Sequence, residues 1–354
     1  MKKTLLAVAV AAALPAVAFA QTNVTLYGIA DAGVGWKDAG GPAKSTMFVD
    51  SGIQSTSRLG VRGSEDLGNG LRATFNLEMG VRFDEGLSDA DVAGRTTWQR
   101  RSVVGLAGSW GEINLGRDYT PGFKSTVRVD MFGYGLYGNW LNFIAGQRGT
   151  GVRASNGLHY TGTFSGVTIN AMYAEGETQS GKSSAGDSYG LSAIYAGGPL
   201  TVQGYFEQQK SDNLTGAKSI RRAGLGGMYN FGQFRLSANY GVVDPSSSLE
   251  AAWGAKKTQA YSIGGGVKVG VGEVLAQVLQ MKHDALAGKD PKVTMFGLSY
   301  VHPLSKRTNL YASYGTAQNN SAGNFALLSS DTALAPGKVG ADQQSFAVGI
   351  RHMF

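Results

Sequence analysis

The sequence has no cysteine among its 354 residues, so neither a disulfide framework nor a thiolate metal site can stabilise the fold. Proline is scarce, at 8 residues, and the 53 glycines follow no three-residue period, which excludes a collagen-like helix. After residue 20, no stretch approaches the roughly 18 consecutive apolar residues that mark a membrane-spanning helix. An all-helical membrane protein is therefore excluded.

The first 20 residues are unlike the rest of the chain. Two lysines precede the apolar run LLAVAVAAAL, a proline interrupts it, and residues 18–20 (AFA) have the small-x-small pattern of a cleavage site. The apolar part is too short to span a bilayer. We interpret residues 1–20 as a secretory signal peptide and residues 21–354 as the exported domain.

Charge and histidine content narrow the choice of partners. The formal charge is +7, of which the signal segment contributes two lysines, and the remaining +5 is spread along the chain instead of forming one basic tract. A nucleic-acid partner is therefore not expected. The four histidines have no metal-ligand spacing, so we expect no cofactor and no metal centre. Weak calcium binding by external carboxylates such as Asp187, Asp284 and Asp290 stays open.

Alternation of apolar and polar residues dominates the rest of the chain. Residues 71–79 (LRATFNLEM) place apolar side chains on one face and polar ones, including Arg72 and Glu78, on the other, which is the period of a strand. The same alternation recurs in residues 167–173 and 234–240, and helical spacing is hardly ever sustained. The chain is predicted to be nearly all strand.

Short clusters of glycine, asparagine, aspartate and proline could close a tight hairpin at seven places. These clusters lie near Gly68, Trp110, Ser165, Gly198, Gly232, Gly270 and Ser305, and eight longer polar stretches lie between or beside them. Seven hairpins join fourteen strands, and one more strand at each end makes 16. Short turns on one side and long loops on the other are typical of an antiparallel transmembrane β-barrel in an outer membrane.

A barrel in lipid must close on itself, because each unpaired backbone group in hydrocarbon costs several kcal/mol. The last residues, FAVGIRHMF, alternate and are predicted to form the closing strand. Phe346, Val348, Ile350 and Phe354 are expected to face outward and Arg351 inward, with the terminal aromatic at the membrane interface.

The same alternation predicts which charges line the lumen, because an arginine that faces lipid at the midplane costs roughly 2 to 4 kcal/mol. In SGIQSTSRLGV, Arg58 is predicted to point inward. The outward set of that segment is Ile53, Ser55, Ser57, Leu59 and Val61.

Three further positions follow from the same reasoning. Glu78 is expected to point inward, and so is Arg153, whose parity is counted from Leu158. Arg100 and Arg101 are consecutive and cannot share a face unless a bulge or a strand end intervenes, so the choice between them stays open.

The longest interval between tight turns runs from Trp110 to Ser165 and has roughly 20 residues more than two strands and one loop need. It contains residues 118–151, which are rich in aromatic residues and glycine. Such a segment is too apolar for a free surface loop, which favours packing against another surface. A subunit contact or a surface position is the alternative.

Four segments taken together resemble the general porins of the beta-proteobacterial outer membrane: NVTLYGIADAG, SRLGVRGSEDLGNGLRATFNLEMG, RRSVVGLAGSWGEINLGRDYTP and the ending GIRHMF. The resemblance covers residues 21–354. It implies a passive, water-filled, sixteen-stranded channel for small hydrophilic solutes and ions, with residues 118–151 as the third external loop folded into the lumen. It also implies a homotrimer in contact with outer-membrane lipid and lipopolysaccharide. The barrel assembly machinery is expected to read Phe354 as an assembly signal.

The resemblance further implies a ladder of arginines on the wall opposite this loop. Arg58, Arg153 and one of Arg100 and Arg101 are expected on the wall, Asp118 and Asp130 on the loop, and Glu78 beside an arginine whose charge it offsets in part. A net cationic ring between low-dielectric walls concentrates anions, so the pore is expected to prefer them.

Two other classes of function stay open at this point. One is a substrate-specific channel or an adhesin whose loops bind a ligand, and the other is an enzyme on a smaller barrel. The sequence has no G-x-S-x-G nucleophile elbow, so an enzyme is not expected. Single-channel conductance distinguishes these classes, since a general pore conducts roughly in proportion to salt.

Overall fold

The computed structural model describes residues 23–42, 45–91, 96–145, 151–176, 186–210, 219–246, 249–250 and 255–354. The expected signal peptide, residues 1–20, lies outside the described residues. Within the described ranges, no helix is long and apolar enough to cross a membrane.

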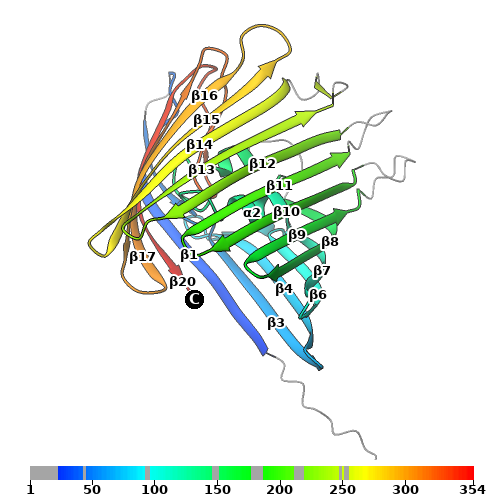
Figure 1. Ribbon diagram of the computed structural model, residues 1–354. Coiled ribbons are helices and arrows are strands. Elements are labelled where there is room, and N and C mark those ends of the chain that lie inside the picture. The colour runs from blue at the N-terminus through cyan, green and yellow to red at the C-terminus, as the bar shows by residue number, and fades with distance from the viewer. Residues whose placement is uncertain are drawn as a thin grey trace, which may run out of the picture.

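Sixteen long strands in the described part of the chain form one antiparallel sheet that closes into a barrel (Figure 1). The predicted fold class is confirmed. The strands are β1 (Asn23–Asp38), β3 (Arg58–Gly68), β4 (Leu71–Arg82), β6 (Arg101–Gly108), β7 (Gly111–Tyr119), β8 (Arg153–Phe164), β9 (Val167–Ala174), β10 (Ser188–Gly197), β11 (Leu200–Lys210), β12 (Ser219–Asn230), β13 (Phe234–Pro245), β14 (Ala255–Val269), β15 (Gly272–Ala285), β16 (Lys292–Pro303), β17 (Thr308–Asn319) and β20 (Gln343–Met353).

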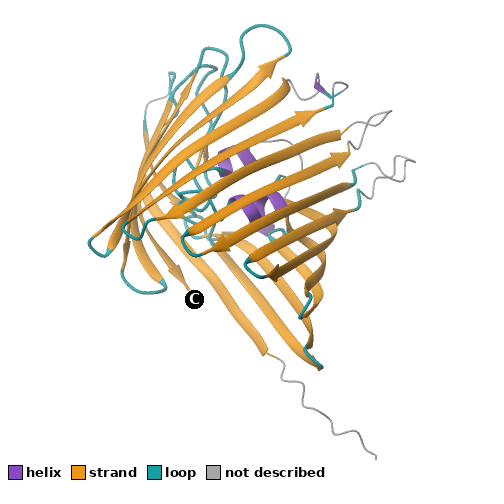
Figure 2. Cartoon of the chain, in the orientation of Figure 1, coloured by secondary structure: helices purple, strands orange, loops and turns teal. Residues whose placement is uncertain are grey.

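Several short elements supplement the barrel strands. β2 (Thr46–Ser51) pairs with the C-terminal half of β1, and β5 (Leu87–Ser88) pairs with β4 beside the 3₁₀ turn η1 (Asp89–Asp91). β18 (Leu327–Leu328) and β19 (Ala333–Leu334) form a separate small hairpin. Two helices, α2 (Pro121–Thr126) and α3 (Leu141–Ala145), lie inside the barrel (Figure 2).

The last strand closes the barrel against the first, as its alternation predicts. β20 pairs with β17 on one side and with β1 on the other, where Asp31 lies opposite Arg351. The final residue completes the ladder: the Gly28 N–H donates to the Phe354 carbonyl at 3.0 Å, and the Phe354 N–H donates to the Gly28 carbonyl at 3.1 Å. The sheet therefore has no unpaired edge at this seam, as a sheet surrounded by lipid requires.

All seven predicted hairpins join consecutive barrel strands. In six of them, all except the one near Ser305, the chain reverses through residues with a positive φ. Ser165 (φ 49°) and Gly166 (φ 82°), for example, connect β8 to β9, as expected of the turn type that matches strand twist. The opposite ends of the strands carry the longer connections, as predicted.

Strand alternation sorts side chains between lipid and lumen. Val104 on β6 is 60% exposed on the outer surface, whereas Asn76 on β4 is buried on the inner one and accepts a hydrogen bond from the Tyr27 hydroxyl at 3.0 Å. On β20, Val348 and Ile350 are exposed outside, and Arg351 donates to Ser55 inside. These orientations confirm the predicted lipid and lumen faces.

Three of the five positions predicted to face outward around Arg58 do not: Ile53, Ser55 and Ser57. β3 begins at Arg58, and residues 52–57 leave the barrel wall and fold into the lumen, so Ile53 and Ser57 are fully buried. The cause is Asp31, whose carboxylate accepts hydrogen bonds from three consecutive backbone N–H groups, those of residues 53–55, at 2.7–3.2 Å. Alternation does not apply to a segment that is not a strand.

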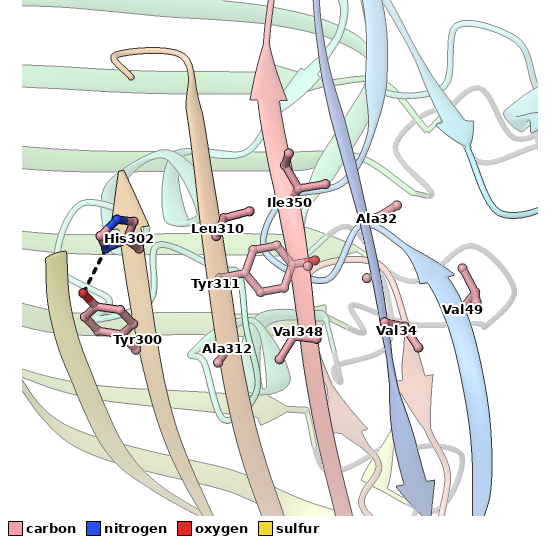
Figure 3. Close-up of a pocket in the computed structure, with 12 residues that line it drawn as sticks. Ala32, Val34, Val49, Tyr300, His302, Leu310, Tyr311, Ala312, Val348 and Ile350 are labelled. Carbon is pink, nitrogen blue, oxygen red and sulfur yellow. Dashed lines mark hydrogen bonds between the residues drawn. The ribbon is translucent and has the colours of Figure 1, made fainter. Parts of the chain in front are cut away.

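The outer surface near the seam carries an apolar groove of about 810 Å³ between β2 and β16 (Figure 3). The wall is thin here because Gly33 and Gly349 have no side chains. Tyr311 reaches across both glycines on the inner side and donates its hydroxyl to Asp31 at 2.7 Å. The seam is thus tied to the segment that Asp31 holds in the lumen.

Candidate functional site

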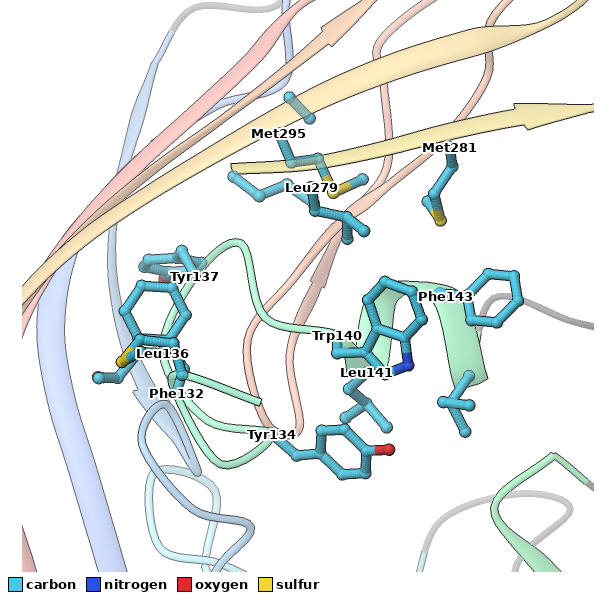
Figure 4. Packing of buried hydrophobic residues seen from close by; sticks show 14 of the residues in the cluster. Phe132, Tyr134, Leu136, Tyr137, Trp140, Leu141, Phe143, Leu279, Met281 and Met295 are labelled. Atoms are coloured by element: carbon cyan, nitrogen blue, oxygen red, sulfur yellow. The ribbon is translucent and has the colours of Figure 1, made fainter. Parts of the chain in front are cut away.

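The connection between β7 and β8, residues 120–152, is named the inner loop, and its described residues, 120–145 and 151–152, lie inside the barrel. The described part of the loop presents a cluster of apolar side chains, including Met131, Trp140 and Phe143, to the wall of β11–β20. Figure 4 shows Trp140 and Phe143 of the loop with Leu279 and Met295 of the wall, all members of this cluster. The inner loop therefore packs against another surface, as its composition predicts.

Glycines of the wall leave room for this packing. A Cβ on Gly297 would meet the Tyr137 carbonyl and the Phe132 ring, and one on Gly241 would meet the Phe143 ring. Because inward positions of these strands carry no side chain, the loop approaches the backbone of the sheet.

Asp130 and Gln277 form the polar part of this attachment. The Asp130 carboxylate accepts from the backbone N–H groups of Tyr134 at 2.8 Å and Trp140 at 2.9 Å, and from the Gln277 amide at 2.9 Å. Burial raises the pKa of the Asp130 carboxyl, and the backbone N–H donors offset part of that rise. Asp130 thus lies on the inner loop as expected, but its carboxylate holds the loop to the wall and does not line open space.

A second attachment lies at the start of α2. Thr120 caps the helix by accepting from the Phe123 N–H at 3.2 Å, and Pro121 occupies the first turn, a combination typical of helix starts. The Gly122 N–H donates to the Glu207 carboxylate of β11 at 2.6 Å. This short helix is therefore fixed to the wall at its first turn.

The opposite side of the inner loop borders a cavity of about 390 Å³, which we name the arginine cavity. Three guanidinium groups line it: Arg58 at the start of β3, Arg100 just before β6, and Arg153 at the start of β8. The sequence analysis proposed Arg58, Arg153 and one of Arg100 and Arg101 for the wall, and the fold brings Arg58, Arg100 and Arg153 together.

Hydrogen bonds hold the three arginines in place. Glu78 accepts from Arg100 Nε at 2.8 Å and lies 3.8 Å from Arg58 Nη1. The Tyr119 hydroxyl oxygen accepts from both Arg100 Nη2 at 2.9 Å and Arg153 Nη2 at 3.1 Å, and the Arg153 guanidinium lies 4.5 Å from the Tyr119 ring centre. Glu78 therefore offsets part of the positive charge.

Arg100 and Arg101 both point inward, since Arg100 precedes the strand and escapes its alternation. Arg101 lies 3.1 Å from Asp118 and borders a second cavity, of about 400 Å³. Asp118 is fully buried in β7, not on the inner loop, and also pairs with Lys124 at 3.0 Å. Of the two arginines, Arg100 is the one that lines the arginine cavity.

The inward position of Arg153 does not follow from counting along a regular strand. The pairing of β7 with β8 shifts register between Gly116 and Asp118, and Asn156 has a positive φ of 56°. Arg153 reaches the cavity because it is the first residue of β8 and lies beyond this irregularity.

Sequence reasoning missed several lining residues. Gln54, Ser55 and Thr56 come from the segment that Asp31 folds inward, and Ser330 and Asp331 come from the long connection between β17 and β20. No local pattern marks these positions. The one available signal is the length of the connection between β17 and β20, which is longer than a surface loop between two strands needs.

The external carboxylates considered for calcium have basic neighbours. Lys282 lies 3.1 Å from Asp284 and 2.7 Å from Asp290, and Lys210 lies 3.3 Å from Asp187. Each of these carboxylates therefore already has a cationic partner.

A closed antiparallel barrel with an apolar exterior and a charged, narrowed lumen defines a channel of the outer membrane. Residues 7–322 match the Gram-negative porin family, and the chain belongs to that family. It is an outer-membrane general porin, a passive channel and not an enzyme.

Individual proteins resemble the chain over nearly their full length. The chain is 37% identical to outer membrane porin protein 32 of Delftia acidovorans, with 100% of both chains covered. It resembles the solved structure of an anion-selective porin from Comamonas acidovorans, with a TM-score of 0.80, 33% identity, and 94% of this chain and 100% of that chain covered. The trimer form of OmpT from Vibrio cholerae has the same fold, with a TM-score of 0.67, 16% identity, and 94% and 99% covered.

Proposed function

We propose that the arginine cavity is the constriction of this porin and that it makes the channel prefer anions. The observation that carries the proposal is the balance of charge: three guanidinium groups line the cavity against one carboxylate, that of Asp331. A cationic ring in a narrow, low-dielectric passage raises the local concentration of anions. Support also comes from the relative in Comamonas acidovorans, which is described as anion-selective.

The proposal assigns different roles to the charged residues of the sequence analysis. Arg58, Arg100 and Arg153 attract the anion, and Glu78 positions two of them. Asp118 and Asp130 do not form an anionic face opposite the arginines. They are buried and hold Arg101, Lys124 and the inner loop in place.

A reversal potential across a planar bilayer in asymmetric KCl tests the sign of the selectivity. The purified porin is expected to pass chloride more readily than potassium. The variants Arg58→Glu and Arg153→Glu should each lower the chloride-to-potassium permeability ratio, because the replacement changes the local charge by two. A potassium preference in the parent would refute the proposal, and an unchanged ratio in both variants would remove these residues from it.

We also infer that the chain assembles as a homotrimer in contact with outer-membrane lipid and lipopolysaccharide. The trimer form of the OmpT relative supports this inference. Cross-linking in native outer membranes, followed by electrophoresis of unheated and heated samples, measures the assembly. Only monomer in both samples would refute it.

Phe354 is proposed as the signal that the barrel assembly machinery reads. Its backbone completes the seam while its ring covers Gly28 on the outer surface. Phe354→Ala should reduce the amount of porin inserted into the outer membrane, whereas Phe354→Trp, which keeps an aromatic ring, should restore it. Equal insertion of all three proteins would contradict the role.

A further inference from the structure

The arginine cavity has two chemically different sides. The barrel wall contributes guanidinium groups, whereas the inner loop contributes apolar side chains, among them Phe123, Val127 and Val152. These three residues pack against the buried core of the loop and are themselves only partly buried. An apolar surface therefore faces the arginines across the cavity.

The polar side is suited to a carboxylate. Arg58 uses Nε to donate to the Thr56 carbonyl at 2.9 Å, and Arg153 uses one Nη2 hydrogen for Tyr119, so N–H donors remain on both guanidinium groups. The Tyr119 oxygen already accepts from two arginines, which leaves its own hydrogen to donate. Such a cluster of donors matches the planar, two-oxygen geometry of a carboxylate.

The apolar side adds a requirement that a small inorganic anion does not meet. Phe123 and Val127 lie four residues apart and so share one face of α2 and its C-terminal cap. A hydrated chloride gains nothing from this face, whereas an alkyl chain or ring loses contact with water against it.

Resting on the proposed anion preference, we propose that the constriction selects small monocarboxylates with an aliphatic or aromatic body over hydroxylated anions of equal size. The carboxylate faces the arginines while the apolar body slides along Phe123, Val127 and Val152. The passage thereby distinguishes organic anions by their polarity as well as by their charge.

Two anions with the same number of heavy atoms test this selection: valerate, which has an alkyl chain, and glycerate, which carries two hydroxyl groups. Reversal potentials with the potassium salt of each against KCl give their permeabilities relative to chloride. In the parent, the ratio of valerate to glycerate permeability should exceed the ratio of their mobilities in free solution about threefold, the order expected for partial burial of one or two methylene groups.

The variant Val127→Thr/Val152→Thr keeps the shape of both side chains and adds hydroxyl groups to the apolar face. It should return the valerate-to-glycerate ratio to that of free solution. Val104→Thr is the matched control, because Val104 lies on the outer surface of β6, and it should keep the parent ratio.

The outcomes separate this inference from the proposed function. A chloride preference over potassium combined with a valerate-to-glycerate ratio equal to that of free solution would overturn the inference alone. A raised ratio that the double valine variant leaves unchanged would overturn it as well. A potassium preference in KCl would refute the anion preference and, with it, the inference.

Discussion

The two sides of the lumen are built from strands of the same kind but have different inner surfaces, one apolar and one charged. The wall of β13–β17 turns glycine, leucine and methionine inward and binds the inner loop. On the other side, the first residues of β3 and β8 and the residue just before β6 bring arginines to the arginine cavity. Alternation gives both sides an inner face, and only the chemistry of that face differs. One wall therefore attaches the inner loop, and the other carries the arginines that we propose meet the solute.

Adding volume to the wall that packs against the inner loop should have the largest effect on the packing of that loop. In Gly297→Ala, the added methyl group would meet the backbone of Tyr137 and the ring of Phe132, neither of which can move without shifting the inner loop. We expect a loss of about 1 to 3 kcal/mol in the stability of the packed loop. The single-channel conductance should rise severalfold as the loop moves away.

Gly204→Ala is the control for this substitution. A Cβ on Gly204 would have its nearest neighbour at 3.8 Å, so the same added methyl group fits. Its conductance and thermal unfolding, followed by circular dichroism in detergent, should match the parent. If Gly297→Ala behaved in the same way, the wall would not be holding the loop.

Removing the polar attachment should have a smaller effect than overfilling. Gln277→Leu leaves the Asp130 carboxylate, the Met131 N–H and the Gly138 carbonyl without their partner in β15. Leaving a buried donor or acceptor unpaired costs about 1 to 3 kcal/mol, although the apolar contacts of the loop remain.

This loosening should increase open-channel current noise while changing the mean conductance little. Gln280→Leu serves as a control, because Gln280 lies on the same strand as Gln277 but forms hydrogen bonds with Tyr261 and Thr294 of the neighbouring strands. Equal noise in the two variants would show that the polar attachment is dispensable.

On the opposite wall, Asp331→Asn should raise the anion preference. Asp331 carries the one carboxylate among the described residues that line the arginine cavity, so its removal increases the net positive charge there. The chloride-to-potassium permeability ratio from reversal potentials should rise about twofold. Asp84→Asn, on the exposed loop between β4 and β5, should leave it unchanged. A fall of the ratio in Asp331→Asn would contradict the proposed electrostatics.

The smallest effect should come from salt. The screening length falls from about 10 Å at 0.1 M to about 3 Å at 1 M, so high salt weakens the field of the arginines across the cavity. The permeability ratio, measured at the same concentration gradient, should decline moderately as KCl rises. A ratio that is independent of salt would indicate selection by size and not by charge.

Short-range patterns in the sequence were enough to determine the barrel. The period of two in residues 71–79, the seven hairpin clusters and the closing strand depend on local chemistry and on the requirement that lipid leaves no strand edge unpaired, and each is found in the structure. The inward positions of Arg58 and Glu78 follow from the same period. On a regular strand a side chain points to one of only two faces, so the sequence period predicts its direction.

Only the tertiary structure decided what the loops do inside the barrel. Ile53 and Ser57 lie off the wall because Asp31, on another strand, accepts a hydrogen bond from the Ile53 N–H and donates its own backbone N–H to the Ser57 hydroxyl. Asp331 reached the arginine cavity on a segment tied to Thr56, and the two bonded residues, Thr56 and Ser330, are 274 positions apart. The Asp130 carboxylate, expected to line the lumen, instead accepts a hydrogen bond from Gln277, 147 positions away. Such contacts join segments that only the closed cylinder brings together, so no local pattern in the chain indicates them.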